Sequence, residues 1–96
     1  MPAIANYTHA AETQGQQPDT KPGAYFVSVV DGQRVGLLLG PFVDNHAAAL
    51  ARVDMVRAKA EEMDSRAVFY AFGTVRLDAD HPRAEKHGIL NSHFGM

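Results

Sequence analysis

The clearest pattern in the chain is a pair of apolar runs joined by a turn signal. Residues 24–30 read Ala-Tyr-Phe-Val-Ser-Val-Val, and residues 33–39 form a second run that starts at Gln33. Asp31-Gly32 stands between them and favours a type I′ turn, because both central positions of that turn need a positive φ. Gly40-Pro41 ends the second run, since proline donates no hydrogen bond to a sheet ladder. The pattern predicts a β-hairpin.

A three- and four-residue period follows the hairpin and predicts one amphipathic helix. Asp44 or Asn45 is the expected N-cap, because either side chain can accept a hydrogen bond from a free N–H of the first turn. The positions that recur at this period form one apolar stripe, made of Ala49, Leu50, Val53, Val56, Ala60 and Met63. Asp64-Ser65 ends the helix. Residues 67–77, aromatic and β-branched in the middle, then predict a third strand.

Together these elements predict an α+β domain of ββαβ type: a β-hairpin, one crossover helix and a third strand, with the helix on one face of a mainly antiparallel sheet. A third strand beside the first gives the order 2-1-3 with every pair antiparallel, whereas a third strand beside the second is parallel to it. The right-handed crossover rule allows either order. Residues 1–23 are then a flexible N-terminal arm, residues 24–77 the domain, and residues 78–96 a polar C-terminal tail.

Both faces of the predicted sheet are apolar. A two-residue turn at Asp31-Gly32 pairs Val30 with Gln33, and alternation along the strands then assigns every side chain to a face. One face carries Ala24, Phe26, Ser28, Val30, Val35, Leu37 and Leu39, and the other carries Tyr25, Val27, Val29, Gly36 and Leu38 with Val68, Tyr70 and Phe72. One helix covers only one face, so we expect a second cover. The candidates are a second copy of the chain, its own arm or tail, and a partner molecule or single-stranded nucleic acid.

The first hypothesis is that the uncovered face pairs with a second copy of the chain. The residues predicted to form this binding surface are Tyr25, Val27, Val29, Leu38, Val68, Tyr70 and Phe72, with Arg34 and Arg76 beside them. The alternative is a single-stranded nucleic-acid binder, because open sheets stack bases on aromatic rings with help from arginine. The aromatic spacing does not match an RNA-recognition strand, and a net charge of −2 weighs against this alternative.

Length and composition limit the class of protein. The 96 residues are enough for one domain and too few for two. Because the chain has no cysteine, disulfides and thiolate chemistry are excluded, and a reducing cytoplasm is the expected compartment. The N-terminal residues do not read as a signal peptide, and no apolar run approaches the roughly 20 residues of a membrane span. We therefore expect a cytoplasmic protein that does not enter a membrane.

Candidate chemistry is sparse. The one cluster of histidines and carboxylates lies in the tail and consists of Asp78, Asp80, His81, His87 and His93. Its spacing matches no metal-ligand pattern, so a metal-dependent enzyme is kept only as a minor alternative to solvated tail residues. His46, in the first helical turn, is expected to be neutral and half exposed. No nucleophile motif or phosphate-binding loop is present, and we predict no enzyme activity, cofactor or metal.

Two resemblances bear on function. The segment from Val35 to Arg66, with Gly40-Pro41-Phe42 and an alanine-rich helix, resembles half of a SPOR domain, a small sheet module that binds bacterial cell-wall glycan. This chain lacks the second helix of that module, which a dimer would restore. The run from Gly40 to Thr74 also resembles small uncharacterised proteins of bacterial conjugative plasmids and integrative elements. The resemblances and the composition predict a non-enzymatic accessory, regulatory or inhibitor protein of bacterial or mobile-element origin. It would bind a macromolecule, a protein rather than nucleic acid, as a homodimer.

Overall fold

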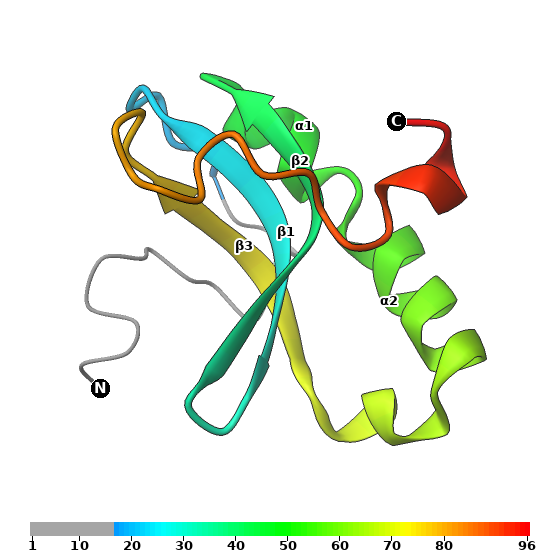
Figure 1. Ribbon diagram of the computed structural model, residues 1–96. Helices are drawn as coiled ribbons and strands as arrows, with labels where there is room; N and C mark the ends of the chain where they lie inside the picture. The colour runs from blue at the N-terminus through cyan, green and yellow to red at the C-terminus, as the bar shows by residue number, and fades with distance from the viewer. Residues whose placement is uncertain (1–16) are drawn as a thin grey trace.

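The computed structural model describes residues 17–96, so residues 1–16 of the predicted arm (1–23) lie outside the described residues. Three strands, two α-helices and two short 3₁₀ helices make up this part of the chain. In chain order they are β1 (Ala24–Asp31), β2 (Arg34–Val43), α1 (His46–Leu50), α2 (Val53–Met63), η2 (Ser65–Phe69), β3 (Ala71–Leu77) and η3 (Asn91–Phe94). The order confirms the predicted ββαβ arrangement (Figure 1).

The sheet has the order β2-β1-β3, and both pairs are antiparallel. Of the two strand orders that the sequence allows, the chain therefore adopts the one in which β3 returns beside β1. The helical segment between β2 and β3 carries the chain across one face of the sheet to its far edge. As a result β1 is the central strand, and its residues Phe26 and Val27 are fully buried.

The hairpin turn is displaced by one residue from its predicted place. Asp31 pairs with Arg34 and Val30 pairs with Val35, so Gly32 and Gln33 are the two turn residues. Gly32 has a φ of 63°, which glycine tolerates without strain. The predicted pairing of Val30 with Gln33 is therefore wrong by two positions. Because side chains alternate with a period of two, this shift leaves the residues next to the turn on the faces that were predicted.

Two irregularities later in the hairpin change the faces. Ser28 pairs with Leu37 but Val27 pairs with Leu39, so Leu38 is an extra residue in β2. A second irregularity follows near Gly40, which has a φ of 142°, and a Cβ there would lie 2.8 Å from the Phe26 ring. Such bulges shift the alternation of one strand against the other. Leu39 consequently joins Leu38 in the core cluster on the helix side, and its predicted place on the opposite face is wrong.

The predicted single helix is divided in two. Asn45 is the N-cap of α1, and its side chain accepts a hydrogen bond of 3.1 Å from the Ala48 N–H. Asp44 does not cap the helix, since its carboxylate binds the Gly23 N–H at 2.8 Å instead. The helix is interrupted at Ala51 and Arg52 and resumes as α2, which buries Val53 and Val56 against the sheet. No helix within residues 17–96 is long and apolar enough to cross a membrane.

The third strand is shorter than predicted. Residues 65–69 form the 3₁₀ helix η2, and the strand begins only at Ala71. The Asp64 side chain accepts a hydrogen bond from the Arg66 N–H, which favours a helical turn over an extended start. Val68 and Phe69 are therefore 59% and 85% exposed, whereas an extended chain would have placed them on the sheet.

Each face of the sheet has its own cover. Helices α1 and α2 lie on the face of Val27, Leu38 and Phe72, which is the face that the sequence interpretation left open. On the other face the C-terminal segment runs across the strands and places Ala84 against Phe26, Leu37, Val75 and Leu77 (Figure 1). The prediction of an uncovered second face is therefore wrong. The own-tail alternative, considered beside self-pairing, describes what the chain does.

The C-terminal segment is anchored by hydrogen bonds as well as by apolar contact. The Ile89 and Leu90 N–H groups donate to the Leu37 and Leu38 carbonyls at 2.9 and 2.8 Å. Asn91, which is 4% exposed, accepts from the Gly40 N–H at 3.0 Å and donates to the Gly40 carbonyl at 2.5 Å. These contacts satisfy backbone groups of β2 that would otherwise face solvent at the edge of the sheet. The tail is part of the folded body.

Candidate interaction groove

An apolar groove of about 290 Å³ lies between α2 and the C-terminal segment. We call it the α2 groove. Its lining comes from all three strands, α2, η2 and the C-terminal segment: Val29, Leu38, Ala60, Met63, Asp64, Ala67, Tyr70, Phe72, Ile89 and Leu90. The groove lies where α2 meets the end of the C-terminal segment, whose Leu90 packs in the same core cluster as Leu38 and Phe72.

The α2 groove has a buried floor and an open edge. Leu38 and Phe72 are 7% and 1% exposed and form the floor, and the half-buried Val29 and Tyr70 continue it. At the edge, Met63 is 53% exposed and Ile89 is 71% exposed. Large apolar side chains that stand open beside an apolar depression are typical of a surface that another molecule covers.

A second depression, of about 340 Å³, continues the α2 groove toward the hairpin turn. The two share Val29, Tyr70 and Ile89, so an occupant of one touches the walls of the other. The second depression is lined in addition by Asp31, Arg34, Val35, Gly36 and Arg83. We call it the arginine pocket. Within residues 17–96 the ion pairs are Lys59–Glu62, Arg66–Asp64 and Arg76–Asp78, and none of them engages Arg34 or Arg83.

The carboxylate at the groove edge is already neutralised. Asp64 Oδ1 and Oδ2 both bind the Arg66 guanidinium, each at 3.2 Å. This side-chain hydrogen bond holds the pKa of Asp64 below its ordinary value, and the backbone hydrogen bond from Arg66 acts in the same direction. Asp64 therefore stays ionised and paired, and it offers no free acid or base to a molecule in the groove.

The structure brings together five of the nine residues predicted for binding. Val29, Leu38, Tyr70 and Phe72 line the α2 groove, and Arg34 lines the arginine pocket beside it. The other four lie elsewhere. Val27 is fully buried in the core, Tyr25 is buried under α1, Val68 is exposed in η2, and Arg76 binds the Pro22 carbonyl and Asp78 at the other end of β1.

The aromatic platform predicted for nucleic acid does not form. Tyr25 and Phe72 are each 1% exposed, so neither ring has a free face on which a base could stack. Tyr25 instead stacks on the His46 ring, with centroids 4.7 Å apart and planes at 15°. Arg57 lies over the Phe72 ring at 5.6 Å. The rings are occupied by the protein itself.

The sequence interpretation missed a polar cluster around His46. This histidine is 7% exposed rather than half exposed, and its Nδ1 accepts a hydrogen bond of 2.7 Å from the Asp19 N–H. Its Nε2 lies 2.9 Å from the buried Thr74 hydroxyl. Burial lowers the pKa of His46, and the Asp19 carboxylate opposes this in part. The Asn45 cap placed His46 in the first helical turn, but only the tertiary fold places it over β3.

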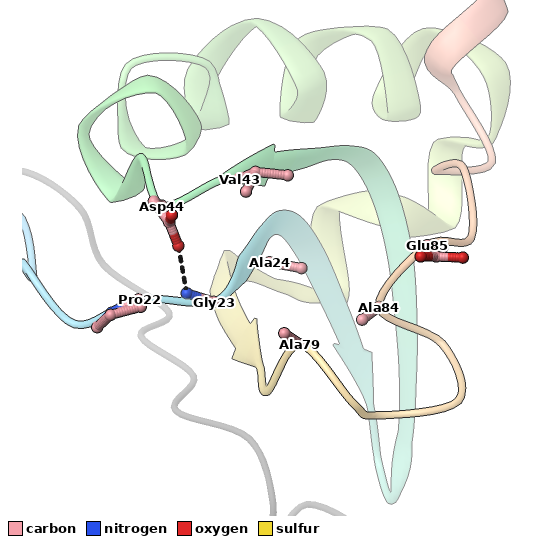
Figure 2. Close-up of a pocket in the computed structure, with 8 residues that line it drawn as sticks. All are labelled: Pro22, Gly23, Ala24, Val43, Asp44, Ala79, Ala84 and Glu85. Carbon is pink, nitrogen blue, oxygen red and sulfur yellow. Dashed lines mark hydrogen bonds between the residues drawn. The ribbon is translucent and has the colours of Figure 1, made fainter.

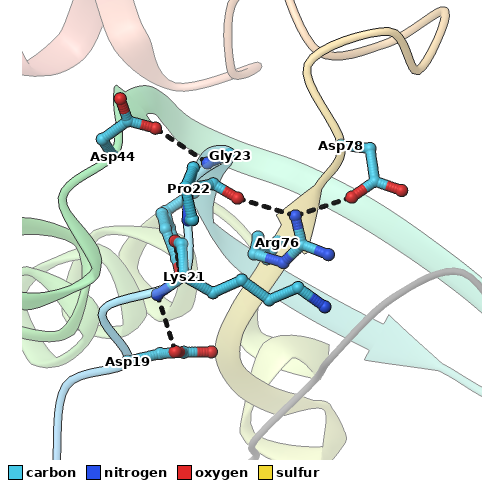
Figure 3. A network of polar contacts seen from close by, with 8 residues as sticks. Asp19, Lys21, Pro22, Gly23, Asp44, Arg76 and Asp78 are labelled. Atoms are coloured by element: carbon cyan, nitrogen blue, oxygen red, sulfur yellow. Dashed lines mark hydrogen bonds and ion pairs between the residues drawn. The ribbon is translucent and has the colours of Figure 1, made fainter.

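The same cluster holds residues 19–23 on the domain (Figure 3). Asp44 binds the Gly23 N–H at 2.8 Å, Arg76 donates to the Pro22 carbonyl at 2.8 Å, and Lys21 N–H donates to the Asp19 carboxylate at 2.8 Å. The Tyr25 hydroxyl donates to the Lys21 carbonyl at 2.5 Å, and burial raises the pKa of that phenol. These hydrogen bonds join the end of the predicted arm to the domain.

A wider depression of about 460 Å³ lies at the start of β1, between the fastened arm and the C-terminal segment (Figure 2). Its walls are mainly small side chains: Pro22, Gly23, Ala24, Val43, Asp44, Ala79, Ala84 and Glu85. The Asp44 carboxylate points to the Gly23 N–H, as Figure 2 shows, and so is engaged by the backbone. Despite its larger volume, this depression presents few groups that could orient a ligand.

The tail histidines do not assemble a metal site. Among residues 17–96 no three side chains of His, Cys, Asp or Glu lie close enough together to hold an ion. His81 Nδ1 accepts a hydrogen bond of 3.0 Å from the Arg83 N–H, which shapes the turn that leads the tail across the sheet. The minor alternative of a tail metal centre thus has no support in the described part of the chain.

Comparison with protein-family models, with curated proteins and with solved structures found no match. The resemblances to half a SPOR domain and to small proteins of mobile elements therefore stay predictions.

Proposed function

We propose that this chain is a non-enzymatic binding protein that engages a polypeptide partner through the α2 groove. The observation that carries the proposal is the open apolar depression between α2 and the C-terminal segment, with Met63 and Ile89 exposed at its edge. Burying such side chains contributes roughly 25 cal/mol per Å² of apolar area, which favours association with a complementary apolar surface.

The chemistry of the lining supports binding rather than catalysis. Catalysis of proton transfer or acyl transfer needs a base or nucleophile within reach of a substrate. Of the described groove residues Asp64 offers the one carboxylate, and Asp64 is held by Arg66 on both oxygens. His46, the buried histidine, uses both ring nitrogens in hydrogen bonds at a different place in the fold. The absence of cysteine supports action in a reducing compartment such as the cytoplasm.

The partner need not be a second copy. The homodimer was predicted from an uncovered sheet face, but α2 and the C-terminal segment each cover one face within residues 17–96. The premise for obligate self-pairing is therefore removed. What remains is a groove smaller than a sheet face, which suits insertion of one or two apolar side chains from a short chain segment. Self-association stays one outcome of the test below.

The test compares two alanines of α2, of which Ala60 is half-buried beside the core cluster and Ala58 is exposed. Ala60 lines the groove, whereas Ala58 is exposed on the same helix. Peptides are selected from a random displayed library on the wild-type protein and then measured on Ala60→Arg and Ala58→Arg variants. We expect the selected peptides to bind Ala58→Arg as they bind wild type and to lose about tenfold or more in affinity on Ala60→Arg, because the new side chain occupies the groove.

Thermal unfolding of both variants, followed by circular dichroism, checks that each remains folded. Light scattering after size exclusion on the same three proteins reports self-association. A dimer that Ala60→Arg dissociates and Ala58→Arg leaves intact makes a second copy the occupant, and still supports the groove as a binding surface. Failure to select any peptide from a monomeric wild type, or equal binding to both variants, contradicts the proposal.

A further inference from the structure

Charge is unevenly distributed along the combined depression. The arginine pocket carries Arg34 and Arg83 against the single carboxylate of Asp31. At the far edge of the α2 groove, the charge of Asp64 is balanced by Arg66. The described lining thus has a local surplus of one positive charge next to an apolar hollow, on a protein whose net charge is −2. A positive spot that opposes the sign of the whole molecule is a specific feature and not a consequence of composition.

The two arginines are available to a partner. Arg34 is exposed in the first position of β2, and Arg83 is half-buried in the segment that crosses the sheet. Neither takes part in an ion pair within residues 17–96. Arginine side chains beside an apolar pocket are enriched where proteins bind one another, because the planar guanidinium receives a carboxylate through two parallel hydrogen bonds.

We propose that the segment bound by the α2 groove is acidic, with an apolar side chain seated between α2 and the C-terminal segment and a neighbouring carboxylate received by Arg34 and Arg83. This inference rests on the function proposed above. The spacing follows from the walls that the two depressions share: Val29, Tyr70 and Ile89. Because the two depressions adjoin along these walls, the apolar and acidic residues of the partner are expected to be close in its sequence.

The same charges argue against a symmetric second copy as the occupant. In a two-fold dimer one patch meets itself, so Arg34 and Arg83 of both protomers would be brought to a single interface. Within residues 17–96, Asp31 is the one carboxylate that lines the arginine pocket, so the positive charges would not be balanced. Like charges in an interface lower its stability. A partner that brings its own carboxylates removes this repulsion and gains attraction during the encounter.

Three fluorescein-labelled peptides test the inference by anisotropy. All share a central Leu-Phe pair, and the residues on either side of it are glutamates in the first peptide, glutamines in the second and lysines in the third. We expect the glutamate peptide to bind about three- to tenfold more tightly than the glutamine peptide, and the lysine peptide to bind most weakly. The preference should shrink as salt is raised, because exposed charges are screened.

Charge reversal tests whether Arg34 and Arg83 cause the preference for the glutamate peptide. The double variant Arg34→Glu/Arg83→Glu should lose the preference for glutamate and favour the lysine peptide, while the glutamine peptide binds it as it binds wild type. Lys86→Glu is the matched control, since Lys86 is exposed on the same segment but does not line the pocket. It carries a charge reversal of the same kind and should leave the order of the three peptides unchanged.

The outcomes separate this inference from the function on which it rests. If all three peptides bind equally and Ala60→Arg abolishes binding, the groove binds apolar segments and the acidic partner is excluded. If the double variant binds the three peptides in the same order of affinity as wild type, the two arginines do not cause the preference and the inference fails. If a folded wild-type protein binds none of the three but binds peptides from the random library, the partner chemistry is wrong. If it binds neither set and is monomeric, the proposed function itself fails.

Discussion

The backbone N–H of Asp19 donates a hydrogen bond of 2.7 Å to Nδ1 of His46, across 27 positions of sequence. Because Nδ1 accepts, the ring proton of the neutral imidazole is on Nε2, where it faces the Thr74 hydroxyl at 2.9 Å. The ring also stacks on Tyr25. One buried histidine thus ties the end of the N-terminal arm, α1, β1 and β3 together.

This arrangement predicts a pH dependence of stability. Burial holds the folded-state pKa of His46 below its ordinary value near 6.5, so below that pH the unfolded chain binds more protons than the folded one. Protonation at Nδ1 also removes the acceptor for the Asp19 N–H. The contribution of His46 is therefore fully present above pH 6.5 and falls as the pH drops below it toward the folded-state pKa. Urea unfolding at a series of pH values measures this.

His46→Asn is the control, because it removes the titrating ring while a side-chain oxygen remains as an acceptor. The variant should be less stable than wild type at neutral pH, and the difference between the two proteins should shrink as the pH is lowered. A proton NMR titration of the His46 ring measures its pKa directly. A value at or above 6.5 contradicts the argument.

Thr74→Val tests the second hydrogen bond of this ring. Valine has nearly the shape of threonine, so the change removes the hydroxyl from a site that is 2% exposed and leaves the His46 Nε2–H without an acceptor. We expect a loss of about 1–3 kcal/mol in the free energy of unfolding. Thr74→Ser keeps the hydroxyl and should lose less. Equal losses for the two variants would mean that methyl packing, and not the hydrogen bond, is the important contact.

Asn91→Ala tests the anchor of the C-terminal segment. The variant removes both hydrogen bonds to Gly40 and leaves the buried Gly40 N–H unpaired, at a cost of roughly 1–3 kcal/mol, whereas the Gly40 carbonyl keeps the hydrogen bond of 3.1 Å from the Gly88 N–H. Amide hydrogen exchange should become faster at Ile89 and Leu90, which donate to β2 next to the anchor. Asn91→Asp, which keeps the acceptor for Gly40, is the milder companion. Unchanged exchange at both amides would show that apolar contact alone holds the segment.

Phe69 and Phe72 should respond very differently to the same change. Phe72 is 1% exposed at the floor of the α2 groove, so Phe72→Ala should cost about 3–5 kcal/mol. Phe69 is 85% exposed in η2, and Phe69→Ala should change the free energy of unfolding by no more than about 0.5 kcal/mol. Chemical denaturation of both variants checks the contrast. Similar losses would mean that residues 67–69 are extended on the sheet, as the sequence alone predicted.

Local sequence signals predicted much of the fold. The Asp31-Gly32 turn signal located the hairpin to within one residue, and the Asp44-Asn45 pair marked the start of the helix, where the structure assigns the cap to Asn45. Both depend on short-range chemistry: a positive φ that glycine tolerates and a side chain that caps a free N–H. The bulge at Leu38 has no such signal, because it arises from how β2 fits against β1 and the tail. The sequence therefore gave no sign that Leu39 lies on the helix side of the sheet.

The binding surface could be predicted only in part. The apolar residues Val29, Leu38, Tyr70 and Phe72 were identified from alternation, and they do share one face of the sheet. Their exposure could not be predicted, because it depends on α2 and the tail, which cover most of that face and leave a groove. Arg83 and Ile89, which complete the two depressions, belong to a segment that reads as a polar tail with no periodic pattern.

By itself the amino-acid sequence determined the order of the elements, a hairpin followed by a helical segment and a third strand, since periodicity, turn residues and caps act over a few positions. It also determined that two apolar faces need two covers. Only the tertiary structure decided which face receives the helices, that the C-terminal segment covers the other, and that His46 is buried over Thr74. Those outcomes depend on contacts between residues far apart in the chain. Such contacts form only in the packed tertiary structure, so no local sequence signal predicts them.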